Sequence, residues 1–154
     1  MIKHHKRIRL KAGIYQATDL PCSITVCTKN GKGIFSNKLF AAEFLNLLTE
    51  HSSLNDIPVY AYCIMPDHVH LLISASEKKD IIGFVREIKS SATRMAWKYN
   101  HRGSIWQTSF YDHFLRKDED LRQVVNYIIQ NPVRKGIVTE WKSYPFCGSL
   151  VYDL

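Results

Sequence analysis

Two histidines separated by one apolar residue form the first group in this sequence with chemical potential. They lie in His68-Val69-His70, which runs directly into three further aliphatic residues. If the segment is extended, alternate side chains point to opposite faces, so His68 and His70 share one face and Val69 lies on the other. Two imidazoles on one face are suited to binding a metal ion together. The alternative is that each is a hydrogen-bonded histidine of the core.

A tyrosine and an amide form the second group. Tyr127 and Asn131 are four residues apart, just before Pro132, so in a helix they lie on one face about one turn from each other. Tyr127 falls at the edge of the apolar stripe, where its ring can rest on apolar surface while its hydroxyl stays accessible. A tyrosine hydroxyl and a neutral amide oxygen would thus be presented together. Alternatively, Tyr127 is a boundary aromatic and Asn131 a helix cap ahead of proline.

Periodicity, capping residues and turn signals predict the elements that must position these groups. Each amphipathic helix needs a sheet face on which to bury its apolar stripe, which favours an α+β domain. We expect a ferredoxin-like fold, an antiparallel β-sheet with helices packed on it. The order is strand (22–28), helix (capped by Ser36 or Asn37), strand (57–65), strand (68–75), helix (capped by Asp80, to about 99), strand (105–115) and helix (121–130).

The chain as a whole has the features of one compact domain. Its 154 residues show no linker or repeat, so we expect a single domain over 1–154, with a basic N-terminal arm over 1–12. No apolar run approaches the roughly 20 residues that cross a bilayer, and the arm lacks the apolar core of a secretory signal. A cytoplasmic protein with no membrane partner is therefore expected. The four cysteines lack C-x-x-C spacing and are expected to be free thiols.

The charge balance favours a polyanionic partner. Lys and Arg number 21 against 14 Asp and Glu, which gives a formal net charge of +7. Cationic side chains that neutralise phosphates release counterions and strengthen association with nucleic acids. Many basic proteins bind no nucleic acid, however, so the charge alone does not decide the function.

Several segments together resemble the single-tyrosine HUH transposases, and most closely the branch associated with repetitive extragenic palindromes (REP). The resemblance runs from about residue 13 to about residue 150, and the segments keep the order and spacing of that family. The segments are YCIMPDHVHLLI (62–73), GSIWQ (103–107), FYDH (110–113), YIIQNPV (127–133) and GIV (136–138).

The resemblance implies an enzyme that cuts and joins single-stranded DNA through a 5′-phosphotyrosine intermediate. Tyr127 would be the nucleophile, and His68 and His70, on a central strand, would be ligands to Mg2+ or Mn2+. Insertion-sequence relatives use a glutamine one turn after the tyrosine as third ligand. This chain has Asn131 there, which we favour, and Gln130 beside it. The phenol also needs help from the field of the metal or from a nearby base. Asp67 and His113 are candidates for that base, and the alternative is that they are a turn residue and a surface histidine.

The implied partner is single-stranded or hairpin DNA in a bacterial cytoplasm, where the bound protein would be associated with the nucleoid. A homodimer with the tyrosine helix docked in trans and a monomer acting in cis are both open. Aromatic side chains could stack on unpaired bases, and we consider Tyr62, Trp97, Trp106, Phe110 and Tyr111. The cationic candidates for DNA contact are Lys6, Arg7, Arg9, Lys11, Arg86, Lys89, Arg94, Lys98, Arg102, Arg116 and Arg134.

Three other functions compete with this one. A non-catalytic nucleic-acid-binding domain could keep the fold and the charge but cut nothing. A zinc hydrolase could use His68 and His70, although no third histidine, cysteine or glutamate stands at a ligand-like spacing. A rolling-circle replication initiator shares the chemistry, but the short chain has no helicase region.

Overall fold

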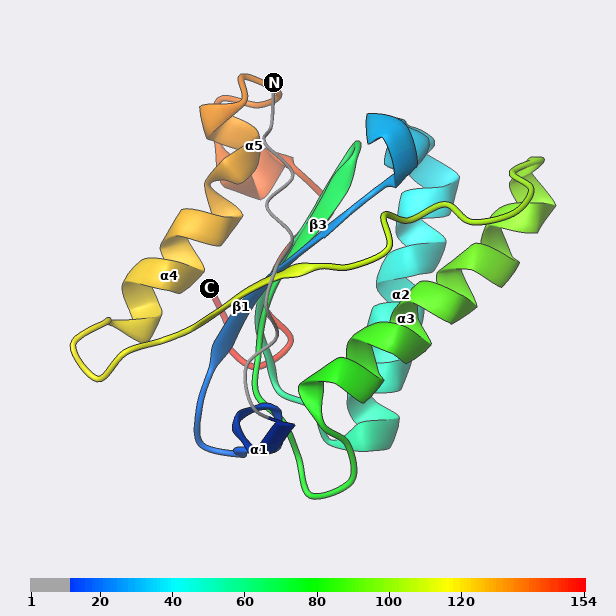
Figure 1. Cartoon of the computed structure of the whole chain (residues 1–154). Coiled ribbons are helices and arrows are strands. Elements are labelled where there is room, and N and C mark those ends of the chain that lie inside the picture. The colour runs from blue at the N-terminus through cyan, green and yellow to red at the C-terminus, as the bar shows by residue number, and fades with distance from the viewer. Residues whose placement is uncertain (1–11) are drawn as a thin grey trace.

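A five-stranded antiparallel sheet forms the centre of the molecule (Figure 1). The computed structural model describes residues 12–154. In the sheet the strands lie in the order β4-β1-β3-β2-β5, and every neighbouring pair is antiparallel. The strands are β1 (Cys22–Cys27), β2 (Val59–Met65), β3 (His68–Ile73), β4 (Tyr111–Phe114) and β5 (Cys147–Gly148).

The helices connect these strands in the way that the sequence predicts. The run β1-α2-β2-β3-α3-β4 is the ferredoxin-like arrangement, so the predicted fold class is confirmed. The α-helices are α1 (Ala12–Tyr15), α2 (Lys38–Asn55), α3 (Ile81–Ala96), α4 (Leu121–Ile129) and α5 (Asn131–Arg134). Short 3-10 turns add η1 (Lys29–Gly31), η2 (Ile34–Ser36), η3 (Trp97–Tyr99) and η4 (Trp141–Ser143).

Polar side chains fix where the long helices begin. The Asn37 side chain accepts hydrogen bonds from the first turn of α2, and Asp80 does the same for α3 through the backbone N–H of Gly83. Such caps satisfy backbone donors that the helix itself leaves without partners. Of the two predicted caps for the first long helix, Asn37 is therefore the one used.

The prediction of one strand over residues 105–115 was wrong in its length. Only β4 pairs regularly, and the start of the segment makes a single bridge between Trp106 and Thr28. Trp106 is buried, and its indole N–H donates to the Lys89 backbone carbonyl of α3 at 3.0 Å. Lys89 Nζ in turn donates to the Gln107 carbonyl. The segment is thus held by α3 before it reaches the sheet.

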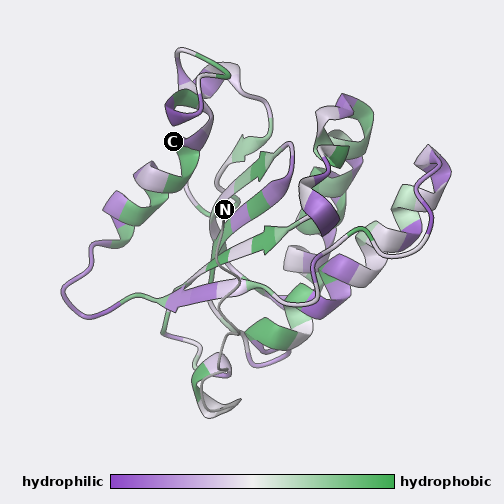
Figure 2. Cartoon of the chain, turned by 45° about the horizontal axis from the view of Figure 1, so that its top comes forward, coloured by the Kyte–Doolittle hydropathy of each residue, from purple (hydrophilic) through white to green (hydrophobic). Residues whose placement is uncertain are grey.

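Helices cover both faces of the sheet and bury separate apolar clusters. In Figure 1, α2 and α3 lie on one side of the sheet and α4 on the other. Val69, Leu71 and Ile73 of β3 join the cluster beneath α2 and α3, whereas Leu72 joins the cluster beneath α4. Side chains alternate along a strand, so His68 and His70 share the α4 face with Leu72. Figure 2 shows the hydrophobic residues gathered on the central strands and the hydrophilic character of the loop between β4 and α4.

Two further sequence-based expectations concern the described part of the chain. Between residues 12 and 154, no helix combines the length and apolarity needed to cross a membrane. All four cysteines are free thiols, as predicted. Cys63 and Cys147 face each other across β2 and β5, and their mutual hydrogen bond together with burial raises the pKa of Cys63.

Candidate functional site

The two histidines of β3 turn their Nε2 atoms toward each other on the α4 side of the sheet. The distance between His68 Nε2 and His70 Nε2 is 3.1 Å, and the two rings stand nearly perpendicular at 87°. β3 is the middle strand of the sheet, so its neighbours hold the pair from both sides. The prediction that both imidazoles share one face is confirmed.

The other ring nitrogen of each histidine is held by a partner. His68 Nδ1 lies 2.6 Å from Asp67 Oδ1, and His70 Nδ1 lies 3.0 Å from the hydroxyl of Thr25, its cross-strand neighbour on β1. A carboxylate only accepts, so Asp67 keeps the proton of His68 on Nδ1 and leaves a lone pair on Nε2. Partners of this kind orient histidine ligands of metal ions and raise their basicity.

The environment of His70 favours its neutral form. Burial, followed by the neighbouring His68 and by the charges of Arg134 and Lys135, lowers the pKa of His70 to about 4. At neutral pH the ring therefore carries no positive charge. Since only a neutral imidazole has a lone pair for a metal ion, His70 is in its ligand form.

Asn131 brings an amide to the same place. Its side chain is buried, and its Nδ2 lies 3.4 Å from His68 Nε2. The two ends of an amide are assigned from hydrogen bonding, so a turn of the group would present its oxygen to the histidines instead. Gln130 precedes it as the residue between α4 and α5. Asn131 is thus the amide that meets the histidines.

These donors fit a small divalent cation that keeps part of its water shell. Residues 12–154 contain no cluster of three or more His, Cys, Asp and Glu side chains able to hold a metal. Two imidazoles and an amide oxygen are a donor set that could hold a divalent cation, with water and substrate oxygens completing its shell.

Tyr127 lies on α4, one turn before Asn131. Val125, Ile128 and Ile129 bury the inner face of this helix against the sheet, whereas the Tyr127 side chain is 63% exposed. The guanidinium carbon of Arg134 lies 3.8 Å from the centre of the Tyr127 ring. Tyr127 is therefore open to a large substrate and carries a cation against its ring.

The two alternative proton acceptors are both engaged elsewhere. Asp67 accepts the hydrogen bond from His68 Nδ1 described above. His113 lies on β4, where its Nε2 is 2.9 Å from Oε1 of Glu119. Neither residue is recorded in contact with Tyr127, so the structure singles out neither as its base.

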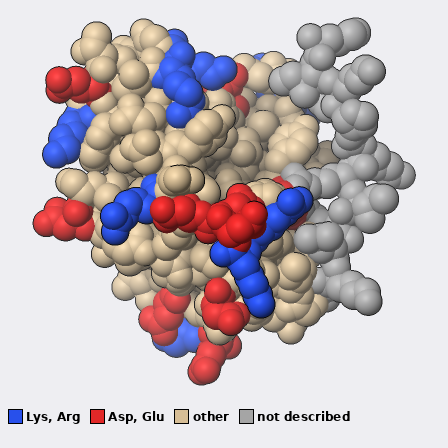
Figure 3. Space-filling model, turned by 90° about the vertical axis from the view of Figure 1, so that its left-hand side faces the viewer, with Lys and Arg blue, Asp and Glu red and all other residues tan. Residues whose placement is uncertain are grey.

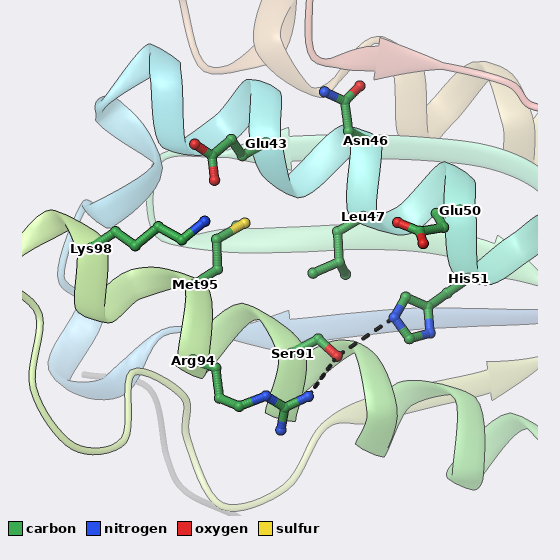
Figure 4. Close-up of a pocket in the computed structure, with 9 residues that line it drawn as sticks. All are labelled: Glu43, Asn46, Leu47, Glu50, His51, Ser91, Arg94, Met95 and Lys98. Carbon is green, nitrogen blue, oxygen red and sulfur yellow. Dashed lines mark hydrogen bonds between the residues drawn. The ribbon is translucent and has the colours of Figure 1, made fainter.

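The predicted cationic contacts are divided between regions of the molecule. Arg86, Lys89, Arg94 and Lys98 belong to α3 and η3, across the sheet from the histidines. Figure 4 shows Arg94 and Lys98 lining a groove between α2 and α3 of about 510 Å³, together with Glu43 and Glu50. This mixture of charges is poorly suited to phosphate. Lys6, Arg7, Arg9 and Lys11 lie outside the described residues.

The side of the molecule that carries α4 also has both charges. Arg116 is exposed in the loop before α4, where its backbone N–H donates to Glu119 at 2.9 Å. In Figure 3, which looks onto this side, basic and acidic side chains are interleaved among the described residues. No single basic stripe therefore marks a DNA path on the face seen there.

Most of the aromatic candidates for stacking are core residues. Tyr62, Trp106 and Phe110 are buried. Trp97 and Tyr111 remain 56% and 38% exposed, so only these two of the five present accessible rings.

Two contacts of the site are absent from the sequence-based prediction. Thr25 holds His70 from β1, and Arg134 covers the ring of Tyr127. The cross-strand register decides the first contact, so it has no local sequence signal. The second joins residues seven positions apart, a spacing of about two helical turns that could have indicated it.

The sequence is similar to those of known proteins. Residues 16–131 match the family model described as "Transposase IS200 like". A REP-associated tyrosine transposase of Escherichia coli K12 is 34% identical over 89 residues, or 57% of this chain and 52% of that protein. The ISDra2 transposase TnpA of Deinococcus radiodurans is 34% identical over 91 residues, or 54% of this chain and 64% of that protein. The chain thus spans little more than half the length of such relatives.

The fold has a counterpart among solved structures. A REP-associated tyrosine transposase bound to a REP hairpin superposes with a TM-score of 0.72 at 23% sequence identity. The superposition covers 93% of this chain and 82% of the other. At this level of identity the likeness establishes the shared architecture.

Proposed function

This chain belongs to the IS200-like transposase family, and on that premise we propose that it is a metal-dependent endonuclease and strand transferase for single-stranded or hairpin DNA. One observation carries the proposal. The facing Nε2 atoms of His68 and His70 meet the side chain of Asn131, one helical turn after the exposed Tyr127. This arrangement would put a cation site and a nucleophile on one face of the sheet.

The protein's own groups would form the metal site. His68 and His70 would supply two nitrogens and Asn131 an amide oxygen to Mg2+ or Mn2+. Thr25 and Asp67 would hold the two rings in the tautomer that leaves Nε2 free. Once bound, such a cation polarises the scissile phosphate and offsets the charge that develops during its displacement.

Tyr127 would perform the covalent step. Its phenol oxygen forms a bond to the phosphorus, and the bond from phosphorus to the 3′ oxygen of the preceding nucleotide breaks. The phenol proton passes to water, which reaches this exposed side chain, and the departing 3′ oxygen takes up a proton. The products are a 5′-phosphotyrosine and a free 3′-OH.

The same intermediate would allow joining without an external energy source. The tyrosyl phosphodiester retains the energy of the broken bond, so the 3′-OH of another strand can attack it and release Tyr127. Cutting and strand transfer would then use the same residues of one site.

Hairpin DNA is the substrate class that the comparisons support best. The structural relative was solved with a REP hairpin, and this chain carries a formal charge of +7. In a bacterial cell, a protein bound to such DNA would be associated with the nucleoid.

A denaturing gel tests the proposal. The wild-type protein is incubated with hairpin DNA carrying a single-stranded flank and Mn2+, with the label on either end of the strand. We expect a covalent adduct that carries the 3′-labelled part, together with a free 5′-labelled fragment ending in 3′-OH. Tyr127→Phe should form none, whereas Tyr152→Phe, which alters another exposed tyrosine, should react normally.

The denaturing gel and a native gel together separate the competing functions. A protein that shifts hairpin DNA on the native gel but yields no adduct with any divalent cation on the denaturing gel would be the non-catalytic binding domain. An adduct that persists in Tyr127→Phe would assign the nucleophile to another residue.

A further inference from the structure

Arg134 lies against the proposed nucleophile. Its guanidinium carbon is 3.8 Å from the centre of the Tyr127 ring. Arg134 is the last residue of α5, seven positions after Tyr127 of α4. Side chains of a helix tilt toward its N-terminus, so a long side chain at Arg134 reaches back over the ring. One face of an otherwise exposed tyrosine is therefore covered by a cation.

The contact with the Tyr127 ring occupies the flat face of the guanidinium and does not use the N–H groups at its edge. A guanidinium is planar and directs five N–H donors outward in its plane. Within the described residues 12–154, no Asp or Glu forms an ion pair with Arg134, and the residue is exposed. The donors are thus available to an anion that approaches Tyr127.

Arg134 is also close to the proposed metal site along the chain. It belongs to the same short helix, α5, as Asn131, whose side chain lies 3.4 Å from His68 Nε2. The cation that stacks on Tyr127 is thus three positions from the amide that contacts the histidines.

We infer that the guanidinium of Arg134 stacks on the Tyr127 ring and hydrogen-bonds through its edge to the scissile phosphodiester. Together these contacts align the phenol oxygen with the phosphorus. The inference rests on the proposed function and assigns a phosphate-binding residue to that site. Lysine could supply the charge but neither the flat stack nor the two parallel hydrogen bonds to phosphate oxygens. Arginine supplies the charge, the flat stack and the two parallel hydrogen bonds together.

Single-turnover adduct formation tests this inference. The rate is measured over a range of DNA concentrations for the wild type, Arg134→Gln and Arg134→Lys, with Lys135→Gln as the control for charge at a neighbouring exposed position. We expect Arg134→Gln to lower the maximal rate about 100-fold, as for loss of one donor to a developing anion. Arg134→Lys should recover only a small part of this loss. Lys135→Gln should weaken DNA binding slightly and leave the maximal rate unchanged.

A substrate without charge at the scissile phosphate makes the test specific. With a methylphosphonate at that position, the ratio of wild-type to Arg134→Gln rates should fall toward one, because Arg134 then has no charge to neutralise. Thermal melting of each variant shows that it is folded. The inference would be overturned by a ratio that is equal on both substrates, or by Arg134→Gln behaving like Lys135→Gln. Absence of any adduct with the wild type would instead overturn the proposed function, and this inference with it.

Discussion

The hydroxyl of Thr25 offers a sharp test of the proposed metal site, because it touches a ligand without being one. Thr25 Oγ1 lies 3.0 Å from His70 Nδ1. Thr25→Val keeps the β-branched shape that suits a strand and removes only the hydroxyl. In the metal-free protein this leaves His70 Nδ1 without its hydrogen-bond partner in either tautomer, so the variant should be folded and about 1 kcal/mol less stable than the wild type. Metal binding forces the proton onto Nδ1, which then faces a methyl group.

Loss of such a partner typically lowers metal affinity about 10- to 100-fold, or about 1.4 to 2.7 kcal/mol of binding free energy. Titration calorimetry with MnCl2 measures the effect directly. Ser23→Ala is the control, because Ser23 lies on the same face of β1 one pair further along, opposite Leu72. If Thr25→Val bound Mn2+ within twofold of the wild type, while the control did so as well, the assignment of Thr25 as the partner that orients His70 would be wrong.

Three other changes probe the amide, the fold and the titration of the site. Asn131→Leu is expected to lower Mn2+ affinity about 10-fold in the same titration, whereas Gln130→Leu should not; the reverse result would make Gln130 the third ligand. Asp80→Ala removes the cap of α3 and should cost about 1 kcal/mol, or about 2–4 °C in melting temperature, and an unchanged melting curve would contradict the role of the cap. The pKa of His70 is lowered to about 4, below that of an unfolded histidine, so its contribution to stability is present above about pH 6.5 and is lost as the pH falls toward 4. Urea unfolding with a chelator present should therefore show a decline over this range that is smaller in His70→Gln, and an equal decline in both proteins would refute this explanation.

The parts of the fold that local patterns determine could be predicted from the sequence. Strand periodicity placed His68 and His70 on one face, and the polar residues Asn37 and Asp80 marked the starts of the long helices. Helical spacing likewise placed Asn131 one turn after Tyr127. Each of these features depends on residues within one or two turns of each other, so the sequence contains the whole cause.

Contacts between distant segments could not be predicted in this way. The position of Thr25 opposite His70 follows from the register of β1 and β3, two strands separated by α2 and β2 along the chain. Trp106 illustrates the same limit, because its hydrogen bond to the Lys89 carbonyl joins the segment to α3, a contact that the alternating pattern of the segment does not indicate. The basic residues of the N-terminal arm remain a prediction for DNA contact.

The central claim is that Tyr127 becomes covalently joined to a 5′ phosphate. Digestion of the protein with protease and nuclease after reaction with hairpin DNA and Mn2+, followed by mass spectrometry of the peptides, tests it most directly. We predict one modified peptide, with a nucleotide attached through its 5′ phosphate to Tyr127, and its disappearance in His68→Ala. A nucleotide on any other residue, or unmodified Tyr127 in a reaction that has cut the DNA, would contradict the claim.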